Sequence, residues 1–395
     1  MMRLFLNCIA ASAGSGLTYV RNVVPHLATR AALRTTICLG PELRKELGNP
    51  ANISFIVKEI PAGAAARFAV EQALLPRLVR AAGSDVLISA GNFALKKSPV
   101  PQILLSGNSL YTSPDFVSDL HDRHAYRMWL DTRIRGFFAR RSVEWADCTV
   151  APSQAFAATL RRWTGEKVVS VYHGFDREIF FRDSAPLPAA IQQKLDAAQN
   201  TLRIVFVSHY NYYRNFETLL RAVPRIRERL GKDVRIFLTC KLSPDEYSGP
   251  FRTESAAALV RRLGISSQIV ELGAVPYRSL HRLIRACDIY VSPAYTETFA
   301  HPLVEAMACG LPVVASDLPV HREICGNAAL YFPRFSSERL ADSVLKLEES
   351  LVLRKQIADS GLKRSQDFSW RTHVDEVLAL AHNLKHGEAE RDRAA

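Results

Sequence analysis

Short apolar runs alternate with longer amphipathic stretches along the whole chain, and they fall into two series. The first series reads RLFLNCI, RTTICLG, ISFIVKEI, DVLISAG, PQILLSG and DCTVAPS. The second reads LRIVFVSHY, VRIFLTC, QIVELGAV, DIYVSPA, PVVAS and AALYFP. Each run has the length and the β-branched content of a buried strand, and helical periodicity separates several of them. This βαβ rhythm predicts an α/β protein with two doubly wound, Rossmann-like parallel sheets.

Domain organisation follows from the length and from the boundary between the two series. A chain of 395 residues exceeds the size of one compact core. The stretch RDSAPLPAAIQQKLDAAQN lies between the series and predicts a linker with a short helix. We therefore expect a first domain over residues 1–174, a second over 175–369, and a closing helix with a polar tail over 370–395.

Composition limits the class of protein. Charged residues make up 23% and hydrophobic residues 48% of the chain, as in a soluble globular protein, and no apolar run approaches the roughly 20 residues that span a bilayer. The start MMRLFLNCIAASA resembles a secretion signal only weakly, because Asn7 interrupts it and cleavage would remove the first strand. The seven cysteines are scattered singly, which predicts reduced thiols in a cytoplasm and no structural zinc.

The net charge of +12 is concentrated in the first half of the chain. Residues 1–174 carry 21 Lys/Arg against 12 Asp/Glu, whereas residues 175–395 carry 30 against 27. A basic first half fits an anionic acceptor or a surface of anionic lipid. Nucleic acid is not expected as a partner, since no helix-turn-helix, RNA-binding or zinc-finger pattern accompanies the charge.

The densest basic patch runs over residues 121–141 and holds six arginines among Trp129, Phe137 and Phe138. As an amphipathic helix it could lie on a bilayer in weak association with anionic lipid. The alternative is an ordinary surface helix whose aromatic face packs on the sheet. We favour the ordinary helix, because Asp122 and Asp131 are interspersed among the arginines.

Two carboxylates, Glu297 and Glu305, stand eight positions apart across a predicted strand-to-helix turn. The run DIYVS predicts a buried strand, and PLVEAMACG predicts a short helix that ends at Gly310. Ligands of α/β sheets bind beyond the carboxyl ends of the strands, and a carboxylate there accepts hydrogen bonds from sugar hydroxyls. On spacing alone, a loop residue and a solvated helix residue explain the two carboxylates equally well.

Residues 297–314 read ETFAHPLVEAMACGLPVV and resemble the signature of the retaining glycosyltransferases of family 4, E-G-F-G-x-P-x-x-E-A-M-A-x-G-x-P-V-V. Both family glycines are replaced, by Thr298 and Ala300. The resemblance implies the GT-B fold, with two facing Rossmann-like domains and a last helix that crosses back to the first. It also implies that Glu297 contacts the donor sugar and Glu305 the ribose.

The resemblance extends to the loop and to two other segments. Backbone amides of Thr298, Phe299, Ala300 and His301 are expected to approach the donor, with the two replacements shifting the sugar specificity. The family pattern G-R-L-x-x-x-K-N aligns its glycine, arginine, lysine and asparagine with Ser208, His209, Arg214 and Asn215. Arg214 is then a ligand of the diphosphate, as is His209 when it donates a hydrogen bond or is protonated. The alternative places Arg214 in a surface turn.

Glycines after the first strand and an asparagine after a later strand complete the candidate site. Gly14 and Gly16 open a predicted helix, whose N-terminus favours a phosphate. A lone G-x-G is a weak signal, and Tyr19 in the third glycine position excludes the full dinucleotide fingerprint. In the family a Gly-Gly at this place touches the donor diphosphate or the acceptor. Asn108 stands where many family members carry a catalytic-face histidine, and it can hold a sugar hydroxyl but cannot transfer a proton.

The resemblance therefore implies a retaining, metal-independent hexosyltransferase in cell-surface polysaccharide or lipopolysaccharide synthesis, in the cytoplasm or on the inner face of the membrane. Its partners would be a nucleotide-diphosphate sugar and a glycan, lipid-linked or small-molecule acceptor. Glu297, Arg214 and Asn108 would be catalytic. No cofactor and no metal are expected, since no D-x-D motif is present. The alternatives are a nucleotide-sugar epimerase and a GT-B scaffold that binds nucleotide sugars without turnover.

Overall fold

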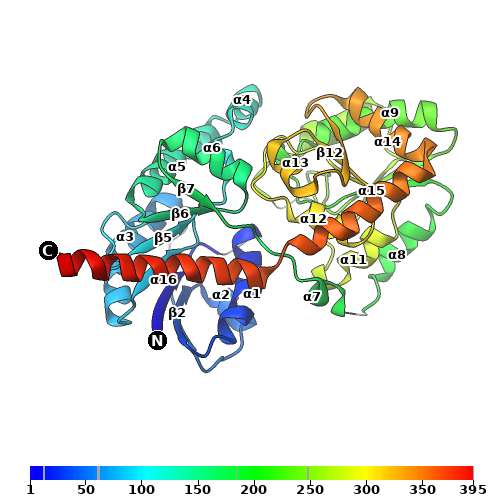
Figure 1. The fold of residues 1–395 in the computed structure, drawn as a ribbon. Helices are drawn as coiled ribbons and strands as arrows, with labels where there is room; N and C mark the ends of the chain where they lie inside the picture. Colours follow the sequence, from blue (N-terminus) through cyan, green and yellow to red (C-terminus); the bar gives the residue numbers. More distant parts are fainter. Residues whose placement is uncertain (12–13, 60–62, 184, 247–248, 395) are drawn as a thin grey trace. The chain divides into compact units, whose positions relative to one another are not determined.

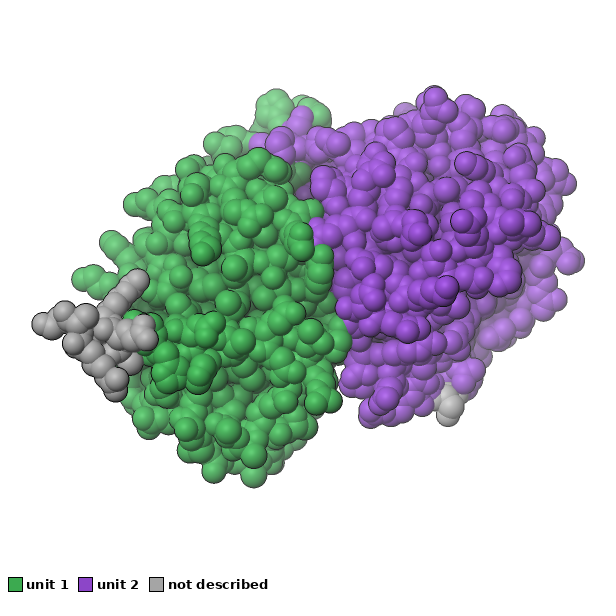
Figure 2. Space-filling view, viewed as in Figure 1, with its two compact units in different colours: residues 1–113, 120–174, 369–395 green, residues 114–119, 175–368 purple. Residues whose placement is uncertain are grey.

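The structure is a computed structural model that describes residues 1–11, 14–59, 63–183, 185–246 and 249–394 (Figure 1). The chain divides into two compact units (Figure 2). The first unit comprises residues 1–113, 120–174 and 369–395, and the second comprises residues 114–119 and 175–368. No helix of the described residues is both long enough and apolar enough to cross a membrane.

The first unit is built on a seven-stranded sheet in the order β3-β2-β1-β4-β5-β6-β7, with every pairing parallel. The strands are β1 (Met2–Asn7), β2 (Leu33–Leu39), β3 (Ile53–Val57), β4 (Val86–Ser89), β5 (Gln102–Leu105), β6 (Cys148–Ala151) and β7 (Val168–Ser170). In the central strands both faces are covered, so that β4 is buried at every position. Burial on both faces explains why the sequence of such a strand is continuously apolar and does not alternate.

Helices connect these strands in the manner of βαβ units. They are α1 (Gly14–Ala28), α2 (Pro41–Glu46), α3 (Ala64–Ala81), η1 (Ser109–Tyr111), α5 (Tyr126–Trp145) and α6 (Gln154–Thr164). Helix α4 (Pro114–Asp122) also lies between β5 and β6 in the chain, but its residues 114–119 belong to the second unit. The aromatic residues of α5 do not all pack inward as predicted. Phe138 lies 4.6 Å from Phe68 between ring centroids, but Phe137 is exposed.

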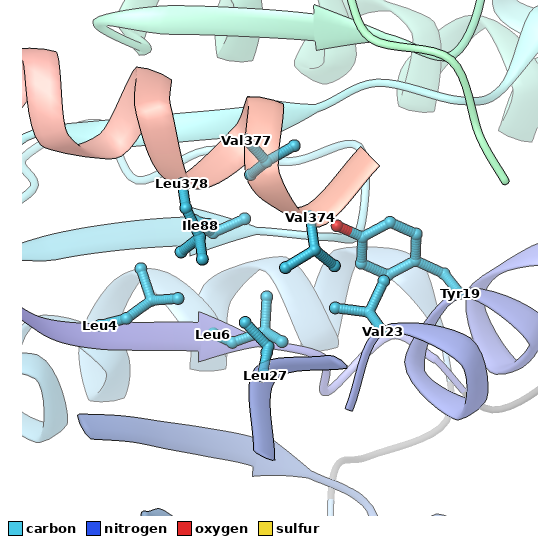
Figure 3. A pocket seen from close by; sticks show the side chains of 9 residues that line it. All are labelled: Leu4, Leu6, Tyr19, Val23, Leu27, Ile88, Val374, Val377 and Leu378. Atoms are coloured by element: carbon cyan, nitrogen blue, oxygen red, sulfur yellow. The ribbon is translucent and has the colours of Figure 1, made fainter. Parts of the chain in front are cut away.

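The C-terminal helix α16 (Trp370–Ala394) packs within the first unit against α1 (Figure 1). Side chains of β1, β4, α1 and α16 line a small apolar cavity of about 10 Å³ (Figure 3). The chain passes α16 at Gly174, where a Cβ atom would lie 1.9 Å from the Trp370 nitrogen. Only glycine therefore fits at this position.

The second unit repeats the arrangement with a six-stranded parallel sheet in the order β10-β9-β8-β11-β12-β13. Its strands are β8 (Leu202–Phe206), β9 (Val234–Leu238), β10 (Ile269–Glu271), β11 (Ile289–Ser292), β12 (Val313–Ser316) and β13 (Ala329–Phe332). Its helices are α7 (Arg177–Arg182), α8 (Ala189–Asp196), η2 (Tyr212–Arg214), α9 (Phe216–Leu230), α10 (Glu254–Arg262), α11 (Tyr277–Arg285), α12 (His301–Ala308), α13 (Pro319–Cys325), α14 (Ser337–Glu349), α15 (Leu351–Arg364) and η3 (Ser365–Asp367).

Both sheets reverse their strand order beside their first strand, between β1 and β4 in the first unit and between β8 and β11 in the second. Such a reversal opens a crevice at the carboxyl ends of the two strands, because the connections leave in opposite directions. All twelve apolar runs of the sequence are strands in the structure, which confirms the predicted pair of doubly wound sheets.

Candidate functional site

An arginine and a glutamate meet beyond the carboxyl ends of β8 and β11, at the reversal point of the second sheet. Arg214 ends the 3-10 turn η2 after β8, and Glu297 lies in the loop after β11. The Nη1 of Arg214 donates a hydrogen bond to Oε1 of Glu297. Their side chains are 19% and 9% exposed. Arg214 therefore lies in a turn, but most of its side chain is covered and engaged by Glu297.

The surroundings keep Arg214 charged and leave part of its guanidinium unused. Burial disfavours the charge, but the carboxylate of Glu297 and the hydroxyls of Tyr213 and Tyr290 outweigh this and raise the arginine's pKa. Within the described part of the chain, the buried Nε of Arg214 has no hydrogen-bond partner. An unpaired buried donor costs about 1–3 kcal/mol, so an incoming anion that accepts from it gains an interaction that the protein alone does not satisfy.

Asn215 holds the two loops in this arrangement. Its side-chain amide donates to the carbonyl oxygens of Pro293, at 3.0 Å, and Arg334, at 2.7 Å. Its Oδ1 accepts from the hydroxyl of Thr218 at 2.9 Å. The residue is buried and has a φ of +55°, in the left-handed region that asparagine adopts more readily than most residues other than glycine. Asn215 was predicted to bind the donor, but its side chain is already hydrogen-bonded within the protein. There it positions the neighbouring residue, Arg214.

The loop after Glu297 enters α12 through a left-handed residue, Ala300, with φ +66°. This is one of the two positions at which the family signature has glycine, and the backbone conformation is the one that glycine adopts without strain. Phe299 is buried and packs edge-to-face on Phe368, so its side chain belongs to the core. Thr298 and His301 are half-buried, and the His301 ring lies 4.8 Å from that of Phe299.

Glu305 lies in α12 and is only 7% exposed. Burial raises its pKa to about 7, and a hydrogen bond with Tyr277 opposes the rise. Its charge, like those of Arg214 and Glu297, acts on the buried hydroxyl of Tyr290 in β11. The carboxylate predicted to hold a ribose is therefore buried, and burial keeps its pKa well above the ordinary value until a partner stabilises its charge.

A buried histidine that senses the charges of Glu297 and Arg214 was not predicted from the sequence. His321 in α13 is fully buried, and its Nδ1 lies 2.9 Å from the carbonyl oxygen of Ser316, to which it donates. Burial lowers its pKa, and the charges of Glu297 and Arg214 act on it in opposite directions. Its Nε2 has no hydrogen-bond partner among the described residues. No motif contains His321, and only the folding of α13 against β12 brings it to the site.

The remaining predicted residues of the second unit lie in the β8 loop. The Ser208 nitrogen donates to Oγ1 of Thr239 at 2.9 Å, and the Ser208 hydroxyl donates to the His209 carbonyl at 2.7 Å. The side chain of His209 is exposed. These contacts hold the loop backbone and leave the His209 ring accessible to a ligand.

The other predicted residues belong to the first unit. Gly14 and Gly16 lie in the first turn of α1, and a Cβ on Gly16 would be 3.3 Å from the Cα of Ala11. Residues 12–13, directly before Gly14, lie outside the described residues. Asn108 caps η1, with its Oδ1 accepting from the Leu110 nitrogen at 3.0 Å. Its predicted catalytic role therefore competes with a local structural one. Among the described residues, no group of three His, Cys, Asp or Glu side chains could hold a metal ion.

Known proteins match this chain both in sequence and in fold. Residues 189–364, which include Arg214, Glu297 and Glu305, match the family described as glycosyl transferases group 1. The chain is 24% identical to D-inositol 3-phosphate glycosyltransferase of Corynebacterium aurimucosum over 241 residues, 58% of this chain and 55% of that relative. It spans about half the length of the curated relatives it matches.

Two solved structures share the architecture of the whole chain. Sucrose-phosphate synthase from Thermosynechococcus elongatus has a TM-score of 0.76 at 17% identity, covering 98% of this chain and 100% of that chain. The HepE protein of Anabaena, in complex with UDP-glucose, has a TM-score of 0.72 at 18% identity, covering 97% and 100%. The fold is therefore GT-B, as predicted, and the match to the glycosyl transferases group 1 family is confined to residues 189–364.

Proposed function

We propose that the protein transfers a sugar from a nucleotide-diphosphate sugar to an acceptor hydroxyl with retention of anomeric configuration and without a metal ion. The observation that carries the proposal is the Arg214–Glu297 pair at the reversal point of the second sheet. It joins a half-buried cation, whose buried Nε is an unused donor, to a carboxylate, and both residues stand between a strand and the following α-helix of the segment that matches the family.

Each group of the site has a defined task in this proposal. Arg214 binds the diphosphate through the guanidinium nitrogens that Glu297 does not use, and the exposed ring of His209 adds a donor. Glu297 accepts from hydroxyls of the sugar. Glu305 accepts from the ribose hydroxyls, and these hydrogen bonds favour its ionised form and lower its pKa from about 7.

The reaction breaks the bond between the anomeric carbon and the β-phosphate oxygen. The acceptor oxygen bonds to the same face of that carbon, and its proton passes to the departing phosphate. Negative charge therefore develops on the phosphate, and Arg214 with the loop amides before α12 stabilises it. Removal of one such preorganised donor typically lowers kcat about 10²–10³-fold.

The comparisons support candidates for both substrates. The HepE complex with UDP-glucose supports a uridine diphosphate donor on a shared fold. The name of the Corynebacterium aurimucosum relative supports a polyol phosphate among the acceptors, beside the glycan and lipid-linked acceptors of cell-surface polysaccharide synthesis. The cytoplasm, where nucleotide sugars are made, is the compartment that fits such a donor.

The first experiment is a thermal-shift screen of the full chain with UDP, GDP, ADP and their sugar conjugates, without added metal. A ligand that binds only the folded state raises Tm by mass action. We expect a shift with one nucleotide family that Glu305→Ala abolishes, followed by sugar transfer with the same donor. A shift without turnover on any acceptor would instead favour a nucleotide-sugar-binding scaffold. The absence of any shift would contradict the donor site.

A further inference from the structure

Helix α5 of the first unit presents a row of large apolar side chains to solvent. Tyr126, Leu130, Ile134 and Phe137 are 53%, 53%, 46% and 60% exposed. They follow one another at intervals of four, four and three residues, so they lie on one face of the helix. The only other large hydrophobic side chains exposed among the first unit's described residues are Met1 and Val57. We call these four residues and the arginines between them the α5 outer face.

The opposite face of α5 is made of small residues. The buried positions are Thr132, Gly136, Ala139, Ser142 and Val143. A Cβ on Gly136 would lie 3.6 Å from the Cβ of Tyr111, so the helix lies close against η1. A surface helix normally buries its large apolar residues and exposes its polar ones, and here the arrangement is reversed. Contiguous apolar surface of this kind marks an interaction site.

Arginines surround the apolar row and give the α5 outer face a positive charge. Arg127, Arg133 and Arg140 are exposed, and no acidic side chain pairs with them in the part of the chain that the structure describes. The acidic residues of α5 are neutralised by other arginines: Asp131 pairs with Arg135 at 2.7 Å, and Glu144 pairs with Arg141. The interspersed acids therefore do not offset the charge of the outer face.

We propose that the α5 outer face binds the surface of a bilayer rich in anionic lipid. A helix with aromatic and aliphatic residues beside arginines lies in the interfacial plane, with its apolar side chains among the acyl chains and its cations at the lipid phosphates. A second copy of this chain fits less well, because a symmetric contact would bring the same unpaired arginines together. The surplus of nine positive charges over residues 1–174 adds attraction toward an anionic surface.

The test is co-sedimentation of the full-length protein with phosphatidylcholine vesicles, with and without an equal share of phosphatidylglycerol. We expect partitioning at least tenfold stronger on the anionic vesicles and weaker with added salt. The double variant Leu130→Ser, Phe137→Ser should lose at least tenfold of this binding. The pair Arg127→Gln, Arg140→Gln should remove most of the preference for anionic lipid.

A matched control lies on the second unit, where Leu351 and Val352 are 72% and 80% exposed. Serine at both of these positions should leave vesicle binding unchanged. Binding that persists in the Leu130→Ser, Phe137→Ser variant would overturn the proposal. So would a dimer in light scattering that this variant dissociates, since the face would then join two copies. Nucleotide thermal shifts are independent of the face, so a failed donor site would not affect the result.

Discussion

Arginine–carboxylate pairs connect the β8 and β11 segments at both ends of these neighbouring strands. At the amino ends, Arg203 and Asp288 approach to 3.4 Å, and both side chains are 27% exposed. At the carboxyl ends, Arg214 and Glu297 are 19% and 9% exposed, and the Nε of Arg214 has no partner in the described residues. Both pairs have the same chemistry, but only the second stands in the crevice where α/β sheets bind ligands. Position in the sheet therefore distinguishes a candidate site from a structural ion pair.

The largest effect is expected on the rate of sugar transfer, which should depend on the Arg214–Glu297 pair and not on the Arg203–Asp288 pair. Arg214→Ala and Glu297→Ala should each lower kcat/KM for sugar transfer by at least about a hundredfold, because each removes a group that acts on the reacting donor. Arg203→Ala, at the other end of the same strands, should change kcat/KM less than about threefold, as a partly exposed pair contributes little. Steady-state kinetics with the donor from the thermal-shift screen measures both. Equal losses in all three variants would show that the pairs do not differ in function.

The buried carboxylate of Glu305 should make the stability of the second unit fall as pH rises, whereas an ion-paired acid with a lowered pKa makes stability rise. Its pKa of about 7 in the folded state exceeds the ordinary value of 4.5. The folded protein then binds more protons than the unfolded one between these values, so this group's contribution to stability falls as pH rises from about 4.5 to 7. Glu305→Gln should remove up to roughly 3 kcal/mol of this decrease in the free energy of unfolding, measured by urea denaturation across pH.

Glu71 in α3 provides the matched control for Glu305. It is buried beside Arg67, and burial raises its pKa to about 7 as well. Glu71→Gln should flatten the pH dependence of stability in the same direction while leaving nucleotide binding unchanged. Loss of donor binding in both variants would indicate that stability, and not contact with the ribose, explains the effect of Glu305.

A smaller effect is expected at Asn215, which bonds both loops. Asn215→Ala leaves the carbonyl oxygens of Pro293 and Arg334 without this donor, and we expect a loss of about 1–3 kcal/mol in the free energy of unfolding. Activity should fall as well, because Arg214 is no longer held opposite Glu297. Asn215→Asp keeps the oxygen that accepts from Thr218 but loses the NH₂ group that donates to the two carbonyl oxygens. It should therefore lose about as much stability as Asn215→Ala. A fully active and stable Asn215→Ala variant would contradict the positioning role.

The smallest effect concerns Ala300, whose φ of +66° is strained for any residue with a Cβ. Ala300→Gly removes strain of about 1–2 kcal/mol but adds freedom to the unfolded chain, so a net gain below about 1 kcal/mol is expected. A rise in Tm of a few degrees or less, by calorimetry, would agree with this. Ala328→Gly, buried outside the loop, provides the comparison and should lower Tm. A lower Tm in Ala300→Gly would mean that packing of the methyl group outweighs the strain.

Much of the fold was predictable because it is encoded in short, contiguous stretches of sequence. Strands buried on both faces give continuous apolar runs, and the signature over residues 297–314 identifies the family segment before any contact is known. The approach of Arg214 to Glu297 was not readable from either motif, since 83 positions separate them. The strand order β8-β11 places the ends of the two motifs side by side.

The sequence by itself therefore determined the two parallel sheets, the resemblance of residues 189–364 to the glycosyl transferases group 1 family, and the identity of the charged residues there. The tertiary structure decided which of these residues touch, which are buried, and which serve the backbone. It turned Asn215 toward two carbonyl oxygens, buried His321 against Ser316, and left four large side chains of α5 in solvent. Periodicity reports which residues share a face, but only packing against the rest of the chain decides which face is inside.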